Sequence, residues 1–111
     1  MSTISWDDFS KIMLVAGTIT RVEDFPQARK PAYKVWVDLG HAGVKCSSAQ
    51  ITTLYSKEEL VGKQVMCVAN FPPKNIAGFP SEVLITGFYR EDGSVVLAVP
   101  DKAIPNGAKL G

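Results

Sequence analysis

One helix start stands among a series of short strand-like runs, and its position limits the folds that this chain can adopt. Ser56 precedes Glu59 by three residues, the spacing of a capping box, and the apolar residues Leu60 and Val61 follow directly. Gly62 then predicts that the helix ends after little more than one turn. The sequence therefore predicts one short helix near the middle of the chain, with strands on both sides of it.

The residues before this helix have the composition of three strands. Residues 12–22 are rich in β-branched side chains and contain Gly17, a combination that favours a strand with a bend or a bulge. Residues 32–40 form a second alternating run, and a glycine-flanked turn at 40–43 leads into a third at 44–48. The second and third strands are therefore predicted to form a hairpin.

The second of these runs has two distinct faces. Alternation places Lys34, Trp36 and Asp38 on one face of the strand. The opposite face is apolar and consists of Tyr33, Val35, Val37 and Leu39. We therefore expect the apolar face to line the core and Trp36 to lie on the outer surface.

The residues after the helix predict the rest of the sheet. Residues 63–70 and 81–89 read as the fourth and fifth strands, and a turn at 91–94 leads into a final short strand at 95–100. In the tail, the isolated Ile104 is expected to pack back on the body of the protein.

A short helix between the third and fourth of five or six strands is the layout of the OB-fold, a five-stranded Greek-key barrel. We therefore predict an all-β, five-stranded OB-fold Greek-key barrel with one short helix between strands three and four and added terminal segments. Residues 1–111 are expected to form a single domain, since a chain of this length supports one core. An SH3-like barrel is the main alternative, although its helical turn usually comes later.

Charge and hydropathy restrict the classes of function. Twelve Lys and Arg face eleven Asp and Glu, and this net charge of +1 argues against a strongly electrostatic nucleic-acid binder. A local basic face is still open, because four cations gather in the second quarter of the chain. They are Arg29, Lys30, Lys34 and Lys45. No apolar run approaches the roughly 20 residues of a membrane span, and Asp7 and Asp8 are unlike a signal peptide, so we expect a cytoplasmic protein without membrane insertion.

Catalytic and metal chemistry find little support. His41 is the one histidine, it lies between glycines in a turn, and no recognisable motif places a Ser or Cys nucleophile beside it. Cys46 and Cys67 have neither C-x-x-C spacing nor a nearby histidine, which predicts two buried structural thiols. We therefore expect no enzyme activity, no metal and no cofactor.

Trp36 is the first feature that indicates binding. It shares its strand face with Lys34, and on the outer face of strands two and three of an OB barrel such a pair forms a base-stacking platform beside a phosphate contact. The alternative is that a helix, a terminus or a second subunit covers Trp36.

The connection between the fourth and fifth strands is the second feature. It is far longer than a hairpin turn, and Pro72 and Pro73 stiffen it, so that it presents Lys74 and Asn75 in a fixed geometry. Gly78 allows a sharp reversal. Three apolar side chains of this loop either plug the mouth of the barrel or line a groove for an apolar partner. They are Phe71, Ile76 and Phe79.

Several motifs resemble the CsaA family, small homodimeric proteins of the tRNA-binding-domain class of OB-folds. The most specific are "FPQARKPAY" and the pattern NFPP, N, IAGF and SEVL within "NFPPKNIAGFPSEVL", and the likeness runs from about Phe9 to Gly111. It implies a homodimeric chaperone linked to protein export, with affinity for unfolded polypeptides and the export motor, and a kinship to tRNA binding. The tRNA-contacting signature of the wider class matches Asn70, Lys74, Ser81 and Glu82.

One segment departs from the family pattern. Residues 13–17 read Met-Leu-Val-Ala-Gly where the family usually has Asp-Ile-Arg, a small residue and Gly. Losing a basic group weakens a phosphate-binding surface, so the departure reduces the expectation of RNA binding more than that of peptide binding. It also leaves open that this strand packs against a partner subunit.

Three functions follow from these observations. The first is a non-catalytic chaperone that binds unfolded polypeptide in a groove lined by Phe71, Ile76 and Phe79. The second is a structure-specific tRNA-binding module that uses the signature residues together with a basic and stacking face. This face would comprise Arg29, Lys30, Lys34, Trp36 and Lys45. The third is an assembly subunit that docks onto a larger enzyme.

Overall fold

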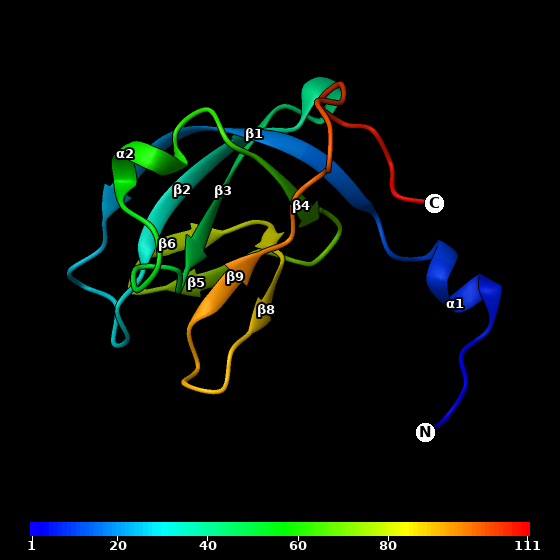
Figure 1. Cartoon of the computed structure of the whole chain (residues 1–111), viewed down its shortest axis with the longest axis horizontal. Helices are drawn as coiled ribbons and strands as arrows, with labels where there is room; N and C mark the ends of the chain where they lie inside the picture. Colours follow the sequence, from blue (N-terminus) through cyan, green and yellow to red (C-terminus); the bar gives the residue numbers. More distant parts are fainter.

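Five antiparallel strands form the main sheet of the computed structural model, which describes all 111 residues. The strands lie in the order β3, β2, β1, β4 and β7 and curl into a nearly closed barrel (Figure 1). Their bounds are Leu14–Asp24 for β1, Tyr33–Asp38 for β2, Val44–Ala49 for β3, Gln64–Val68 for β4 and Leu84–Ile85 for β7. This order confirms the prediction of a five-stranded OB-fold barrel.

The apolar faces of the strands fill the barrel as predicted. Val35, Val37 and Leu39 are fully buried, and Lys34 and Trp36 on the other face of β2 are half-buried. Gly17 is required where β1 lies beside the end of β2, because a Cβ there would lie 2.6 Å from side-chain atoms of Val37 and Leu39. The register of β1 against β2 shifts between Ile19 and Arg21, so the predicted bulge lies just after this glycine.

The predicted helix is present between β3 and β4. Helix α2 spans Lys57–Leu60, and Ser56 and Glu59 form the expected capping box, each side chain accepting the other residue's backbone N–H. Leu60 is fully buried, which explains how a helix of one turn stays in place. None of the helices is long and apolar enough to cross a membrane.

The predicted fifth strand, residues 81–89, is divided into pieces. Residue 81 ends β6 (Phe79–Ser81), β7 pairs with β4, and β8 (Gly87–Tyr89) pairs with β9 (Val95–Leu97) in a hairpin that projects from the barrel (Figure 1). The division occurs at Thr86, which donates its N–H and Oγ1 to the Met66 carbonyl and accepts a bond from the Ala98 N–H. The chain changes partners at this residue.

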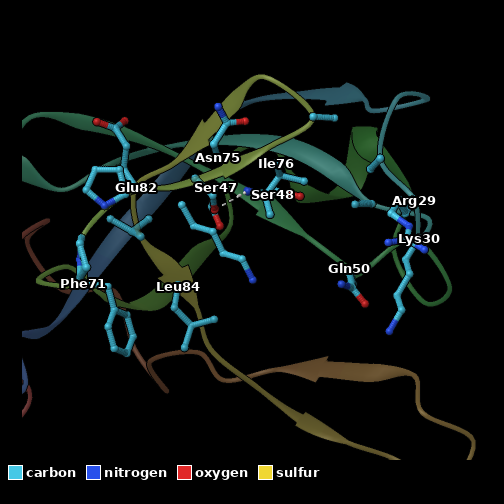
Figure 2. A pocket seen from close by; sticks show the side chains of 18 residues that line it. Arg29, Lys30, Ser47, Ser48, Gln50, Phe71, Asn75, Ile76, Glu82 and Leu84 are labelled. Atoms are coloured by element: carbon cyan, nitrogen blue, oxygen red, sulfur yellow. Dashed lines mark hydrogen bonds between the residues drawn. The ribbon is translucent and has the colours of Figure 1, made fainter.

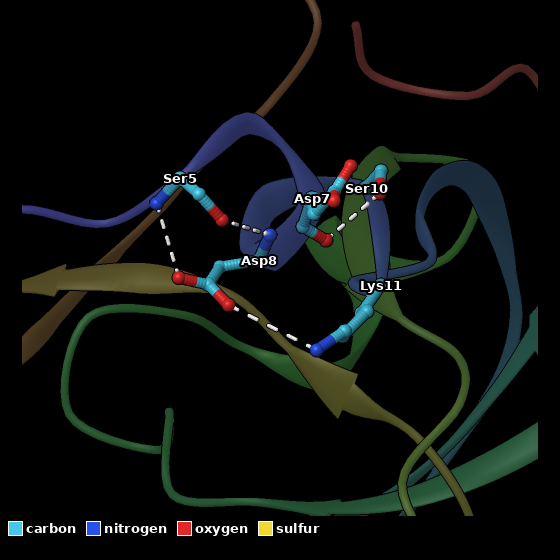
Figure 3. Close-up of polar contacts among 5 residues, drawn as sticks. All are labelled: Ser5, Asp7, Asp8, Ser10 and Lys11. Atoms are coloured by element: carbon cyan, nitrogen blue, oxygen red, sulfur yellow. Dashed lines mark hydrogen bonds and ion pairs between the residues drawn. The ribbon is translucent and has the colours of Figure 1, made fainter.

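The N-terminal helix was not predicted. Helix α1 spans Trp6–Ser10, lies away from the barrel (Figure 1) and has no buried residue. Its capping box joins Ser5 to Asp8, whose carboxylate also pairs with Lys11 (Figure 3). The sequence signal for this helix is weak because aspartate, in place of the usual Glu or Gln, closes the box.

The C-terminal segment adds a short strand-like edge to β1. Ala16 donates to the Ala108 carbonyl at 2.9 Å and Leu110 donates to the Leu14 carbonyl at 2.8 Å. The prediction that Ile104 packs on the body was wrong for its side chain, which is 43% exposed. Its backbone holds the segment instead: the Ile104 carbonyl accepts a hydrogen bond from Gln64 Nε2, and the Ile104 N–H donates one to Gln64 Oε1. A 3-10 turn, η1 (Gly40–Ala42), packs against this segment at Asn106.

Candidate functional site

A groove of about 1250 Å³ opens between the loop before β2, the end of β3 and the segment between β4 and β7. Its walls combine cations with apolar and small polar side chains. The principal members are Arg29, Lys30, Lys74, Phe71, Ile76, Leu84, Ser48 and Gln50. Figure 2 shows Arg29 and Lys30 at one end of the groove and Phe71 and Leu84 at the other. The groove therefore has a basic end and an apolar end.

A small hairpin that the sequence did not predict forms one wall. Strand β5 (Lys74–Ile76) pairs with β6 through a turn at Ala77 and Gly78, whose φ angles are 48° and 85°. Two positive φ values define a type I′ turn, the kind that suits a two-residue hairpin. The side chain of Asn75 accepts the Gly78 N–H at 2.7 Å and fixes the turn further. The reversal expected at Gly78 is confirmed, and the stiffness of the loop comes from strand pairing as well as from its prolines.

Ser81 and Glu82 close the barrel against β3. The Glu82 N–H donates to the Cys46 carbonyl at 2.8 Å, and the Glu82 Oε1 atom accepts the Cys46 N–H at 3.1 Å. Ser81 Oγ accepts the Ser48 N–H at 3.0 Å. Two side chains thus supply acceptors that a neighbouring strand would otherwise provide, and they satisfy backbone donors at the seam.

The same seam shifts two pKa values. Burial, and then the hydrogen bond and charge of Glu82, raise the pKa of the Cys46 thiol to about 11. The hydrogen bond from Cys46 lowers the pKa of the Glu82 carboxyl, although its partial burial acts in the opposite direction. Burial alone raises the pKa of Cys67 to about 12. The prediction of two buried thiols is confirmed, and both stay protonated at neutral pH.

Asn70 connects the end of β4 to the segment before β1. Its Oδ1 accepts the Met13 N–H at 2.9 Å, and its Nδ2 donates to the Lys11 carbonyl at 2.7 Å. Three of the four signature residues therefore bond to the protein's own backbone. The fourth, Lys74, is exposed and lines the groove.

The structure places Trp36 in a cluster of its own, outside the lining of the groove. Phe79 meets both Trp36 and Phe25 edge to face, with ring centroids 5.7 and 5.5 Å apart. Lys34 lies over the rings of Phe25 and Phe79, and Arg21 lies 4.8 Å from the centre of the Trp36 ring. Side chains of the same chain thus occupy the expected stacking platform. Trp36 is covered by the β5–β6 hairpin, through Phe79.

The residues predicted for binding therefore divide into two groups. Those that line the groove are Arg29, Lys30, Lys74, Phe71, Ile76, Ser81 and Glu82. Those that do not line it are Lys34, Trp36, Lys45, Asn70 and Phe79. Phe79 neither plugs the barrel nor joins Phe71, because it packs on the outer face of β2.

The groove also contains residues that the sequence did not single out. Ser48 and Gln50 come from the end of β3, and Val83 and Leu84 follow the signature pair. Leu84 is 50% exposed although it lies in a strand, a signal that appears only in the folded structure. The position of Val15, where the family usually has Arg, is buried in the core, so this substitution removes no cation from the groove.

Metal-binding and histidine chemistry are not assembled at this site. No group of three or more His, Cys, Asp and Glu side chains in the structure could hold a metal ion. His41 is exposed in the 3-10 turn η1 and is not among the residues that line the groove.

The comparisons with known proteins agree with this architecture. A family model described as a putative tRNA binding domain matches residues 14–109. The chain is 39% identical to a methionine–tRNA ligase of Pyrococcus furiosus over 99% of its own length, and it spans 15% of that ligase.

The structural likeness covers nearly the whole chain. The crystal structure of the chaperone CsaA from Bacillus anthracis has a TM-score of 0.94 and 46% identity, and covers 99% of this chain and 100% of its own. The CsaA chaperone protein of Picrophilus torridus has a TM-score of 0.92 and 48% identity, covering 98% and 100%. A MetRS related protein from Pyrococcus horikoshii is similar at a TM-score of 0.88 and 28% identity, with full coverage of both chains. From its barrel, from the family model and from these likenesses, the chain belongs to the tRNA-binding domain family and, within it, to the CsaA family.

Proposed function

We propose that this protein is a non-catalytic chaperone that binds unfolded polypeptide in the groove beside the β5–β6 hairpin. The observation that carries the proposal is the Phe71 side chain, which is 56% exposed in the same groove as three cations. An exposed ring with no partner in its own chain costs free energy in water, and an apolar side chain of a client would cover it.

The cations of the groove are available to a ligand. The structure has three ion pairs, Lys11 with Asp8, Arg21 with Glu23 and Lys57 with Asp24, and none of them involves a groove residue. Glu82 is the one acidic side chain in the lining, and Cys46 already engages its carboxylate. The groove is therefore net positive and suits a polypeptide that carries acidic as well as apolar side chains.

A homodimer fits the distribution of exposed apolar side chains. One group lies on the N-terminal segment around α1 and a second on the projecting strands (Figure 1). These groups comprise Ile4, Trp6, Ile12 and Met13, and Phe88, Tyr89 and Val96. A second copy that buried them would also bring a second groove, and two weak sites on one dimer gain avidity for an extended chain.

The resemblance to the CsaA family also indicates where the protein acts and on which class of client. We propose that the protein acts in the cytoplasm on polypeptides that await export, with the export motor as a partner. Long unfolded segments occur in such clients, and a groove that reads short apolar and acidic stretches can bind many of them.

tRNA is a second candidate ligand, favoured by the family model and by the ligase relatives. Lys74, Arg29 and Lys30 could contact phosphates in the same groove. The enclosed Trp36 cluster and the backbone bonds of Asn70, Ser81 and Glu82 leave few other groups for a nucleic acid. Binding would therefore be weak and would decrease with a shallow salt slope.

A competition experiment separates the two ligands. Fluorescein-labelled, reduced and carboxymethylated α-lactalbumin serves as the unfolded client, with anisotropy measured at about 50 mM salt and unlabelled tRNA as competitor. We expect the client to bind, Lys74→Ala to weaken it about threefold, and Lys102→Ala, an exposed lysine of the tail, to leave it unchanged. If tRNA binds and the client does not, the chaperone proposal is wrong.

A further inference from the structure

Strand β5 has one edge that no other strand covers. It pairs with β6 alone, and Ile76 and Phe79 close the type I′ turn as the hydrogen-bonded pair. Hydrogen-bonded and non-hydrogen-bonded pairs alternate along an antiparallel ladder, so the next pair, Asn75 and Pro80, is a non-hydrogen-bonded one. The backbone N–H and C=O of Asn75 therefore point away from β6.

Two observations support this assignment. Pro80 has no N–H to donate, and a non-hydrogen-bonded position in a ladder is where proline is tolerated. In addition, none of the hydrogen bonds of turns and loops uses the backbone of Asn75. One donor and one acceptor are thus left free on an exposed strand.

This free edge belongs to the groove. Lys74, Asn75 and Ile76 all line it, opposite the end of β3 and the loop that carries Arg29 (Figure 2). A neighbouring N–H and C=O match the backbone of an extended polypeptide, which offers both partners. A phosphate offers acceptors only, so the carbonyl of Asn75 would repel it.

We propose that the edge of β5 is a docking strand, to which an extended client segment adds as a further β-strand. This inference rests on the proposed chaperone function and specifies its binding mode and its ligand class. The ligand is a segment of four or more residues in β conformation in which an acidic and an apolar side chain stand two residues apart and so point to the same face. Alternation along an added strand sends neighbouring side chains to opposite faces.

Charge and shape select such a segment. Arg29 and Lys30, which form no ion pair, attract a carboxylate toward the basic end, and Phe71 and Leu84 receive apolar side chains at the other (Figure 2). Lys74, also without an ion pair, lies on β5 itself. The edge is short, and Pro73 lacks the N–H that would continue it, so few main-chain bonds form at each groove. The added strand is consequently weak and reversible, and pairing between two copies of β5 is limited.

A pair of isomeric probes tests the docking strand. The parent probe is a fluorescein-labelled peptide of sequence Ser-Thr-Val-Thr-Glu-Thr-Val-Gly, whose single glutamate fixes one register and shares its strand face with both valines. One isomer carries N-methyl groups on the amides of one edge of the strand, and the other carries the same number on the opposite edge. We expect one isomer to bind like the parent and the other to lose at least about fivefold in affinity.

A pair of protein variants supplies the matching test. Asn75→Pro removes the outward N–H, whereas Asn75→Ala removes only the side chain that caps the turn. We expect Asn75→Pro to weaken the parent probe about fivefold beyond Asn75→Ala. Circular dichroism checks the fold of both variants, and if Asn75→Pro does not fold, the isomeric probes decide the question.

The outcomes separate this inference from the proposed function. If the carboxymethylated α-lactalbumin and the parent probe bind but both isomers behave alike, the docking strand is wrong and the chaperone function stands. If neither the client nor the probe binds, both are wrong. If tRNA alone binds, the groove is a nucleic-acid site and the docking strand is again wrong.

Discussion

Two regions of this molecule combine aromatic rings with cations, and they differ in what covers the rings. On the outer face of β2, Phe79 joins Trp36 to Phe25, and Lys34 and Arg21 lie over the rings. In the groove, Phe71 lies at the end opposite Arg29 and Lys30 (Figure 2), it is 56% exposed, and none of the cations Arg29, Lys30 and Lys74 forms an ion pair.

The difference separates a structural cluster from the proposed binding surface. A ligand at the Trp36 cluster would have to displace contacts that the protein makes with itself, whereas a ligand in the groove displaces water. An aromatic residue next to a lysine in a strand sequence is therefore insufficient evidence for a stacking platform. An aromatic ring that side chains of the same chain cover is structural, whereas a ring that they leave exposed is open to a ligand.

The largest expected effect comes from removing the centre of the structural cluster. Phe79→Ala should lower the free energy of unfolding by about 2–3 kcal/mol, less than for a fully buried ring, because Phe79 is half-buried. Urea unfolding followed by circular dichroism measures this change. A variant as stable as the wild type would show that the cluster contributes nothing to the fold.

The barrel seam should be the next most sensitive region. Glu82→Ala leaves the Cys46 N–H without its acceptor and should cost about 2 kcal/mol. Glu82→Gln keeps a carbonyl oxygen at that position and should cost less than half as much. Equal losses for the two variants would contradict the role assigned to the acceptor.

The groove cations should affect binding and leave stability unchanged. The triple variant Arg29→Ala, Lys30→Ala, Lys74→Ala should weaken the carboxymethylated client about tenfold and change the free energy of unfolding by at most about 0.5 kcal/mol. The single variant Lys102→Ala is the control for a lost exposed charge. Unchanged client affinity in the triple variant would show that these three cations are outside the binding surface.

The pH dependence should be the smallest effect. The pKa of Glu82 is lowered in the folded protein, so its contribution is complete above the unfolded value of about 4.3 and is lost as the pH falls through the folded value. The stability difference between wild type and Glu82→Gln should therefore be smaller at about pH 3 than at about pH 6. Asp92, whose pKa is also lowered, is the same in both proteins and cancels. A stability difference between the two proteins that is the same at both pH values would contradict the link between the Glu82 pKa and stability.

Local signals were sufficient for most of the barrel. The alternation of residues 32–40, the capping box at Ser56 and the apolar surroundings of the cysteines each depend on neighbours in sequence, and the structure confirms them. The β5–β6 hairpin was missed because a three-residue strand that follows two prolines resembles a loop, and because positive φ at Ala77 is rare for a residue with a Cβ.

The roles of the signature residues could not be predicted from the sequence. Asn70 bonds to Met13 and Lys11, and Glu82 bonds to Cys46, so the partners are far apart along the chain. A polar residue that closes a barrel looks the same in sequence as one that contacts a ligand. Only Lys74 of the four has no internal partner, and this distinction required the folded structure.

The most direct test compares the two phenylalanines. Phe71→Ala and Phe79→Ala are each measured for urea unfolding and, under conditions where both are folded, for affinity to the carboxymethylated client. We predict that Phe71→Ala weakens the client about fivefold with a free energy of unfolding within about 0.5 kcal/mol of wild type, and that Phe79→Ala loses stability while its folded form binds normally. A client affinity that decreased with Phe79→Ala and stayed constant with Phe71→Ala would place the binding surface at the Trp36 cluster and contradict the account.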